Sequence, residues 1–468
     1  MRELSKESIY LFERMPIRKA VIKQVGPSIF SQMVALLYNL SDTYFVGILN
    51  SPIQTAAMTV AAPLTLMLTA IANIFAIGGA SLISSSLGKK EYERAKQIGN
   101  CSFWYGIVAA ILYSSIVMTG AIPLLNLCGA DESIYPSAHA YIKWVVGIGG
   151  ISSITSLILS SLIRSEGYST MASIGLSIGG ILNIILDPIF VLPNMLNMGI
   201  RGAGLATALS NLCSTLFLFV CLFKRCSIIN LENPWFYFCK FKTMREISVA
   251  GMPSAIQYLM TVVAAAALSK FMSSYGAAAI AAIGIVKKID MLPLFFSIGV
   301  SSGILPLLAY GFSKGNVDRC RSILAFACII SISFSGLCLI GYEIYAPRLV
   351  ALFINEQETV SYAVSFLRIM VTAMPMMSIC HPLITYFQAT GRISESIICS
   401  LLRKGVLDIP LLFIADKIIP MYGCAAVQPI VDSIALFAAA VLYKKCNAKS
   451  SGMIFQYVKP ANGCRRQQ

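Results

Sequence analysis

Long runs of hydrophobic residues recur along the whole chain, with short polar segments between them. Two of these runs, residues 106–125 and 324–341, approach the roughly 20 residues that a helix needs to cross about 30 Å of hydrocarbon. The pattern predicts helices at approximately 25–48, 56–85, 98–127, 138–163, 168–192, 202–223, 247–272, 279–310, 321–342, 360–389, 394–415 and 422–443. We therefore expect an all-α integral membrane protein with twelve transmembrane helices.

The composition supports a membrane protein. Hydrophobic residues make up 57% of the chain and charged residues only 12%, whereas soluble domains carry about 25% charged residues. Residues 1–24 mix basic and acidic side chains and lack both a short apolar core and a cleavage site, so we expect no removable signal peptide. The 14 cysteines lie mostly in apolar runs and form no CxxC pair, which favours membrane packing over a metal site or disulfides.

The net charge of +15 raises the question of nucleic-acid binding. The basic residues form short clusters between apolar runs, however, and not one aromatic-interleaved surface, so we expect no nucleic-acid partner. If both termini are cytoplasmic, most Lys and Arg lie in the tails and inner loops, and the outer loops hold only Arg201, Arg348 and Lys417. This asymmetry follows the positive-inside rule and predicts a multi-pass protein of the cell membrane.

Similar motifs occur in the two halves of the chain. GKKEYERA at 88–95 matches SKGNVDRC at 313–320, and LDP at 186–188 matches LDIP at 407–410. The spacing predicts two six-helix bundles related by a pseudo-two-fold axis along the membrane normal, with a central cavity between them. The expected parts are a cytoplasmic N-terminal segment (1–24), an N-terminal lobe (25–223), a cytoplasmic linker (224–246), a C-terminal lobe (247–443) and a basic cytoplasmic tail (444–468).

Four polar residues fall at one depth of the predicted membrane region. Asp42, Asp187 and Thr207 each lie about six residues from the outer end of their helices, roughly 10 Å below the surface, and Asn183 lies one turn from Asp187 on the same helix face. Oxygen donors suit a hard ion such as Na⁺, and two nearby carboxylates in a low dielectric can hold a proton, so H⁺ and Na⁺ remain alternatives. The competing interpretation is that the two aspartates cap helix ends.

Other polar residues are candidates for the central cavity. Gln32, Tyr38, Asn39, Gln257 and Tyr258 either line it or bond to neighbouring helices. The cavity should be mostly apolar and favour flat lipophilic cations over anions.

Charged residues of the second half complete the set of candidates. Asp290 is a further cavity candidate, although Lys287 and Lys288 are near enough in sequence to pair with it. Lys270 is a candidate partner for Asp408. Pro27 gives the first helix a place to bend.

The stretches at 26–47, 78–96, 179–191 and 199–211 resemble the multidrug and toxic compound extrusion (MATE) family, in its MepA-like bacterial branch. The resemblance runs from about residue 17 to 443. It implies a coupling-ion site at the four residues of shared depth, no cofactor, and a monomer in the bacterial inner membrane. It also implies export of small, often cationic organic compounds by alternating access, in exchange for H⁺ or Na⁺. Residues 251–270 lack the carboxylate that some members carry there.

Two other functions fit the sequence less well. A flippase for lipid-linked sugars would need a strongly basic cavity, whereas we expect the basic residues at the cytoplasmic face. An enzyme is disfavoured because two isolated His residues and no nucleophile or metal motif leave nothing to perform chemistry.

Overall fold

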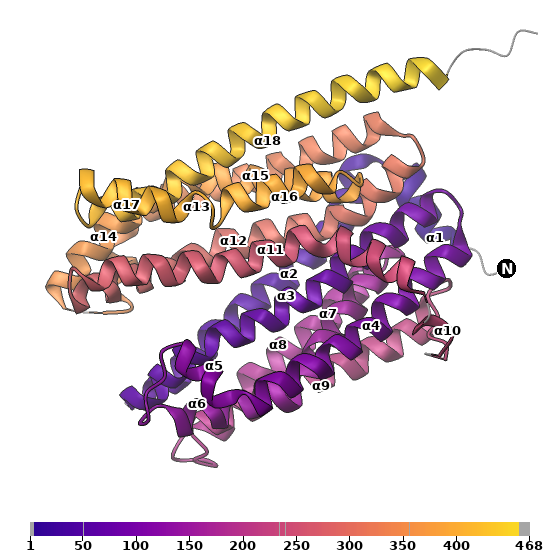
Figure 1. Cartoon of the computed structure of the whole chain (residues 1–468). Coiled ribbons are helices and arrows are strands. Elements are labelled where there is room, and N and C mark those ends of the chain that lie inside the picture. Colours follow the sequence, from indigo (N-terminus) through magenta and orange to yellow (C-terminus); the bar gives the residue numbers. More distant parts are fainter. Residues whose placement is uncertain (1–3, 50, 234, 239, 355, 458–468) are drawn as a thin grey trace, which may run out of the picture.

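The computed structural model consists of helices and connecting loops throughout the residues that it describes, which are all except 1–3, 50, 234, 239, 355 and 458–468. Two helical bundles lie side by side (Figure 1). The prediction of an all-α membrane fold with two bundles is confirmed.

The first bundle follows a short N-terminal segment made of α1 (Lys6–Ile9) and the π-helical turn η1 (Tyr10–Arg14). Its elements are α2 (Ile17–Ile48), α3 (Pro52–Gly88), α4 (Tyr92–Thr119), α5 (Ala121–Leu127), α6 (Tyr135–Ile142), η2 (Lys143–Ile148), α7 (Gly149–Ser165), α8 (Ser169–Val191) and α9 (Ile200–Arg225). The short helix α10 (Trp235–Phe238) lies in the connection to the second bundle.

The second bundle repeats this order. Its elements are α11 (Phe241–Ser273), α12 (Ala277–Ser313), α13 (Val317–Ala351), α14 (Gln357–Val371), α15 (Met374–Ala389), α16 (Ile393–Arg403), α17 (Asp408–Ile418) and α18 (Tyr422–Tyr457), whose side chains are described as far as Cys446.

In the described part of the chain, ten helical spans are long and apolar enough to cross a membrane. The α14–α15 pair, bent by 47°, supplies an eleventh. The α16–α17 pair occupies the place of the predicted helix at 394–415; each of the two helices has 11 residues and is too short to span a membrane alone. The bend has a local cause, because Pro375 has no N–H for the carbonyl of Val371. Between α16 and α17, Gly405 takes a φ of +105°, which ends the first helix.

The two bundles are in close contact at the end where the N-terminus lies. A Cβ on Gly78 of α3 would lie 2.2 Å from the carbonyl oxygen of Ile247, and a Cβ on Gly251 of α11 would lie 2.0 Å from that of Ile74. Only glycine permits this backbone approach between α3 and α11. Towards the opposite end the bundles diverge (Figure 1).

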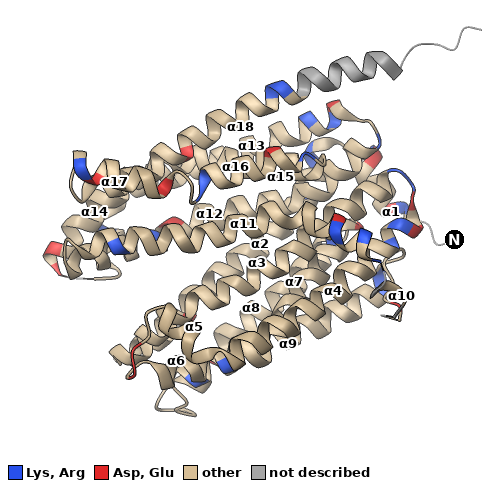
Figure 2. Cartoon of the chain, in the orientation of Figure 1, with Lys and Arg blue, Asp and Glu red and all other residues tan. Residues whose placement is uncertain are grey.

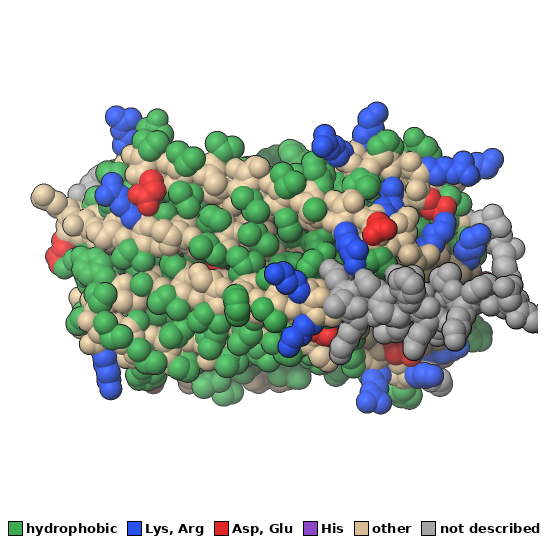
Figure 3. All heavy atoms as spheres, turned by 90° about the horizontal axis from the view of Figure 1, so that it is seen from above, with side chains coloured by type: hydrophobic (Ala, Val, Ile, Leu, Met, Phe, Trp, Pro, Cys, Tyr) green, Lys and Arg blue, Asp and Glu red, His purple; other side chains and the backbone are tan. Residues whose placement is uncertain are grey.

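Side-chain types are arranged as a membrane protein requires. Hydrophobic side chains cover most of the face in Figure 3, and Lys and Arg gather mainly near the end that carries the N-terminus. The ribbon view shows the same concentration around α1 and α10 (Figure 2). Large exposed hydrophobic residues, such as Leu112, Leu216 and Leu337, fit contact with lipid and not with water.

Candidate functional site

Asp42, Asn183, Asp187 and Thr207 lie together inside the first bundle. The Asn183 amide donates to Thr207 Oγ1 at 3.3 Å and to Asp187 Oδ1 at 3.5 Å. The Asp42 side chain lies close enough to Asp187 for the charges of the two carboxylates to affect each other. Helices α2, α8 and α9 therefore bring these four residues to one place.

Both aspartates are buried, with Asp42 5% and Asp187 0% exposed. Neither caps a helix end, because α2 continues beyond Asp42 to Ile48 and α8 continues beyond Asp187 to Val191. One oxygen of each carboxylate and the Asn183 amide oxygen have no hydrogen-bond partner in the protein. Since buried acceptors are costly when unpaired, this oxygen cluster is suited to a proton or a hard monovalent cation.

Lys288 of α12 reaches this cluster from the second bundle. Its Nζ donates to the hydroxyl of Thr43, the residue after Asp42, at 3.1 Å. Of the two lysines considered as partners for Asp290, Lys288 instead points across the interface between the bundles.

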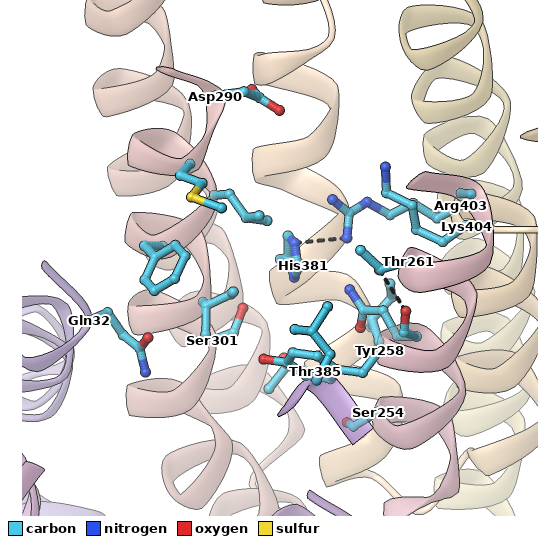
Figure 4. Close-up of a pocket in the computed structure, with 18 of the residues that line it drawn as sticks. Gln32, Ser254, Tyr258, Thr261, Asp290, Ser301, His381, Thr385, Arg403 and Lys404 are labelled. Atoms are coloured by element: carbon cyan, nitrogen blue, oxygen red, sulfur yellow. Dashed lines mark hydrogen bonds between the residues drawn. The ribbon is translucent and has the colours of Figure 1, made fainter. Parts of the chain in front are cut away.

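A cavity of about 490 Å³ lies between the two bundles. Its lining includes five of the candidates from the sequence: Gln32, Asn39, Gln257, Tyr258 and Asp290. Figure 4 shows Gln32 on the side opposite Tyr258 and Thr261, and Asp290 above Ser301. Tyr38 is not among the lining residues; a Cβ on Gly180 of α8 would meet its ring at 3.3 Å.

The cavity also contains charged groups that the sequence interpretation missed. Arg164, Lys287, Arg403 and Lys404 line it, together with the acidic Asp290 and Asp408. The expected concentration of basic residues at the cytoplasmic face therefore does not account for these four. Their position inside predicted helices or between two of them was a signal, since intramembrane charges usually have a function.

A buried polar network lies behind this part of the cavity. Arg403 Nε donates to Asp432 Oδ1 at 3.2 Å, and the two side chains are 1% and 0% exposed. Arg403 Nη1 also lies 2.8 Å from His381 Nε2 (Figure 4). Because a guanidinium has only donors, this histidine nitrogen must accept, so His381 is neutral with its proton on Nδ1. Gln428 bonds Asp432 and Lys404, each at 2.7 Å.

Asp408 has a different environment from the one expected. Its carboxylate accepts a hydrogen bond from the Gly405 amide at 2.5 Å, at the start of α17. Lys270 is exposed near the end of α11 and forms no ion pair among the described residues. The predicted Lys270–Asp408 pair is therefore wrong, because equal position in the repeat does not make two side chains face each other.

Comparisons with a family model and with curated proteins agree on one family. The MatE family model matches residues 27–189 and 253–414. The chain is 26% identical over 439 residues to the multidrug export protein MepA of Staphylococcus saprophyticus, covering 94% of this chain and 96% of that one. It is 27% identical over 444 residues to MepA of Staphylococcus aureus, with the same coverage.

A solved structure has the same fold. It is an outward-facing multidrug resistance MATE transporter of the MOP superfamily, similar to this chain with a TM-score of 0.87 and 21% identity. The match covers 96% of this chain and 100% of the other.

Proposed function

Because the chain belongs to the MatE family and is a membrane transporter, not an enzyme, we propose that it exports lipophilic, often cationic, drugs and toxic compounds in exchange for H⁺ or Na⁺. The observation that carries this proposal is the buried cluster of Asp42, Asn183, Asp187 and Thr207 beside a cavity shared by two bundles. The cavity takes the substrate, and the cluster takes the coupling ion. No cofactor is needed.

The contacts between the bundles support alternating access. They touch at the N-terminal end and diverge at the other, as expected for a state open to the outside if the termini are cytoplasmic. Binding of a cation neutralises the acidic pair and so changes the balance between this state and one open to the inside. Pro27, inside α2, lacks the N–H that would bond to Lys23 and gives that helix its hinge.

The cavity lining suits lipophilic compounds. Most of it is apolar, Tyr258 offers a ring for contact with a flat cation, and Asp290 offers a negative charge. The protein works as a monomer in the bacterial inner membrane with both termini in the cytoplasm. The lobes at 25–223 and 247–443 move about the linker at 224–246.

A flippase for lipid-linked sugars is a second candidate. The observation in its favour is the basic lining formed by Arg164, Lys287, Arg403 and Lys404, which suits phosphate groups. Asp432 neutralises Arg403, however, and Asp290 and Asp408 share the cavity with the two lysines. This balance makes the flippase the weaker candidate.

Transport in proteoliposomes with proton and sodium gradients imposed separately tests the proposed function. Export of an ethidium-like dye should follow one of the two gradients, and Asp187→Asn should reduce it to the level of empty vesicles. Dye export that does not depend on either gradient would contradict antiport. Translocation of a lipid-linked sugar without dye export would contradict it as well.

A further inference from the structure

Arg164 lies in the last turn of α7 and lines the central cavity. Its side chain is only 6% exposed, yet its Nε and Nη2 atoms form no hydrogen bond with the protein. Burying a guanidinium without a partner costs several kcal/mol. A protein that keeps such a group beside a cavity gains from it only when something in the cavity supplies the partner.

The acidic residue closest in sequence does not serve Arg164. Glu166 accepts hydrogen bonds from the backbone N–H groups of Ser227, Ile228 and Ile229, at 2.9, 3.2 and 2.6 Å. Its carboxylate therefore holds the start of the connection after α9. A partner for the Arg164 guanidinium can therefore come only from the cavity that it lines.

The internal repeat supplies a comparison within the same chain. Gly167 and Gly391, which follow α7 and α15, both have positive φ, +98° and +72°, and this correspondence aligns Arg164 with Gln388. Gln388 also lines the cavity, but its amide donates to Ser254 at 2.7 Å. One bundle thus has a neutral, hydrogen-bonded side chain at the position where the other has an unpaired cation.

The other cations of the cavity have a partner or an acidic residue in the same lining. Arg403 pairs with Asp432, Lys404 donates to Gln428, and Lys287 shares the lining with Asp290 and Asp408. Helical side chains lean towards the N-terminal end of their helix, so Arg164, at the end of α7, reaches from the closed end into the cavity. Ser301 of α12, whose hydroxyl is also buried without a partner, lines the same cavity.

We propose that Arg164 binds the carboxylate, or another oxyanion, of an amphipathic organic substrate. This inference rests on the proposed export function and narrows its substrate class. The planar guanidinium offers two parallel N–H donors to a carboxylate. Leu294, Phe295 and Ile298 supply apolar contacts for the body of the molecule.

The same cavity also accommodates a positive group. Asp290 of α12 lines it together with Arg164. A zwitterionic aromatic compound contacts Asp290 with its cationic group and Arg164 with its acid. Lipophilic cations lack the second contact.

A matched pair of dyes tests this assignment. Rhodamine B carries a carboxylate and its ethyl ester does not, while the cationic ring system is the same. In proteoliposomes, Arg164→Gln, which copies the residue of the other bundle, should lower the export of rhodamine B relative to the ester by about tenfold or more, as for loss of a charged hydrogen bond. Arg164→Lys should give an intermediate ratio. Lys270→Gln, which removes an exposed charge, is the control and should keep the wild-type ratio.

Binding provides an independent measurement. Rhodamine B should raise the melting temperature of the wild-type protein in detergent more than the ester does, and Arg164→Gln should remove that difference. If Arg164→Gln fails to fold, the same comparison is made with Arg164→Lys. An equal dye ratio in the wild type and in the folded variants would overturn the Arg164 assignment.

Two further outcomes separate the alternatives. If neither dye is exported by the wild type, the proposed function itself fails. If a fluorescent phospholipid is translocated in an Arg164-dependent manner while rhodamine B is not exported, the oxyanion is a lipid phosphate and the proposed substrate class is wrong.

Discussion

Lys288 of the second bundle donates a hydrogen bond to Thr43 of the first, the residue directly after Asp42. A cation from one bundle therefore lies next to the acidic pair of the other. The positive charge of this lysine opposes the binding of a second cation at the acidic pair. The contact couples ion binding in the first bundle to the separation of the two bundles, because Lys288 must move away from Thr43 when the bundles separate.

Lys288→Gln should lower the coupling-ion concentration that gives half-maximal export by severalfold, since a repelling charge is removed. The maximal rate should fall as well, because the cross-bundle contact is weakened. Export measured over a range of ion concentrations gives both values. Lys270→Gln, at an exposed position, is the control, and an unchanged ion dependence in Lys288→Gln would show that the lysine does not sense the site.

The buried Arg403–Asp432 pair is expected to stabilise the second bundle. Asp432→Asn leaves Arg403 with an uncompensated charge at a site that is 1% exposed, at a cost of about 3–5 kcal/mol. Arg403→Met with Asp432→Leu removes both charges and should recover most of the loss. Thermal unfolding in detergent measures the three proteins. A double variant as unstable as Asp432→Asn would mean that the polar network, not the charge balance, carries the stability.

The N-terminal segment links the two bundles at their closed end. Glu13 accepts a hydrogen bond from Tyr310 at 2.7 Å and pairs with Lys314 at 2.5 Å, while Tyr168 donates to Ser5 at 3.0 Å. Glu13→Gln should weaken this closed end and favour the state open to the inside. Hydrogen exchange of residues 4–15 should become faster. Glu7→Gln is the control, because it changes a largely exposed carboxylate that pairs with Lys23.

The pH dependence of this contact can be predicted from Glu13. The hydrogen bond with Lys314 lowers the pKa of the Glu13 carboxyl below its ordinary value of 4.5. Its contribution is therefore complete above about pH 4.5 and is lost as the pH falls through the lower, folded value. Hydrogen exchange of residues 4–15 should be independent of protonation of Glu13 between about pH 6 and pH 8. A change in protection in that range that disappears in Glu13→Gln would contradict this prediction.

Hydrophobic runs were sufficient to predict the helical bundles, since ten spans are continuous and apolar. The breaks before α15 and α17 were missed, because a hydrophobic run shows how long an apolar segment is but not where a proline or a glycine interrupts the helix. Pro375 and Gly405 were the available signals.

Depth along the helices was sufficient to single out Asp42 and Asp187, because each helix fixes depth by a constant rise per residue. Depth does not fix which way a side chain faces. For this reason Lys270 was assigned to Asp408 wrongly, and the pairing of Arg403 with Asp432, 29 residues away, was not foreseen.

Cysteine labelling tests the proposed orientation. Lys89→Cys and Lys240→Cys place thiols in exposed basic loops at the N-terminal end, and Leu196→Cys places one at the other end. In a chain with the exposed Cys213 and the partly exposed Cys128 replaced by serine, a membrane-impermeant reagent added outside intact cells should label only Leu196→Cys. Labelling of either basic loop from outside would reverse the topology.

The acidic pair provides the most direct test of coupling. Asp42→Asn and Asp187→Asn keep the size and most hydrogen bonds of each side chain but remove the charge that a proton or sodium ion balances. Each should reduce gradient-driven export to the level of empty vesicles and leave equilibrium dye binding largely intact, because the cavity lining is unchanged. Asp408→Asn is the matched comparison. Its amide oxygen still accepts the hydrogen bond from Gly405, so export should fall by less. Export and dye binding are measured for all three variants in the same membranes. Loss of export in Asp408→Asn with normal export in Asp42→Asn would move the coupling site to the second bundle.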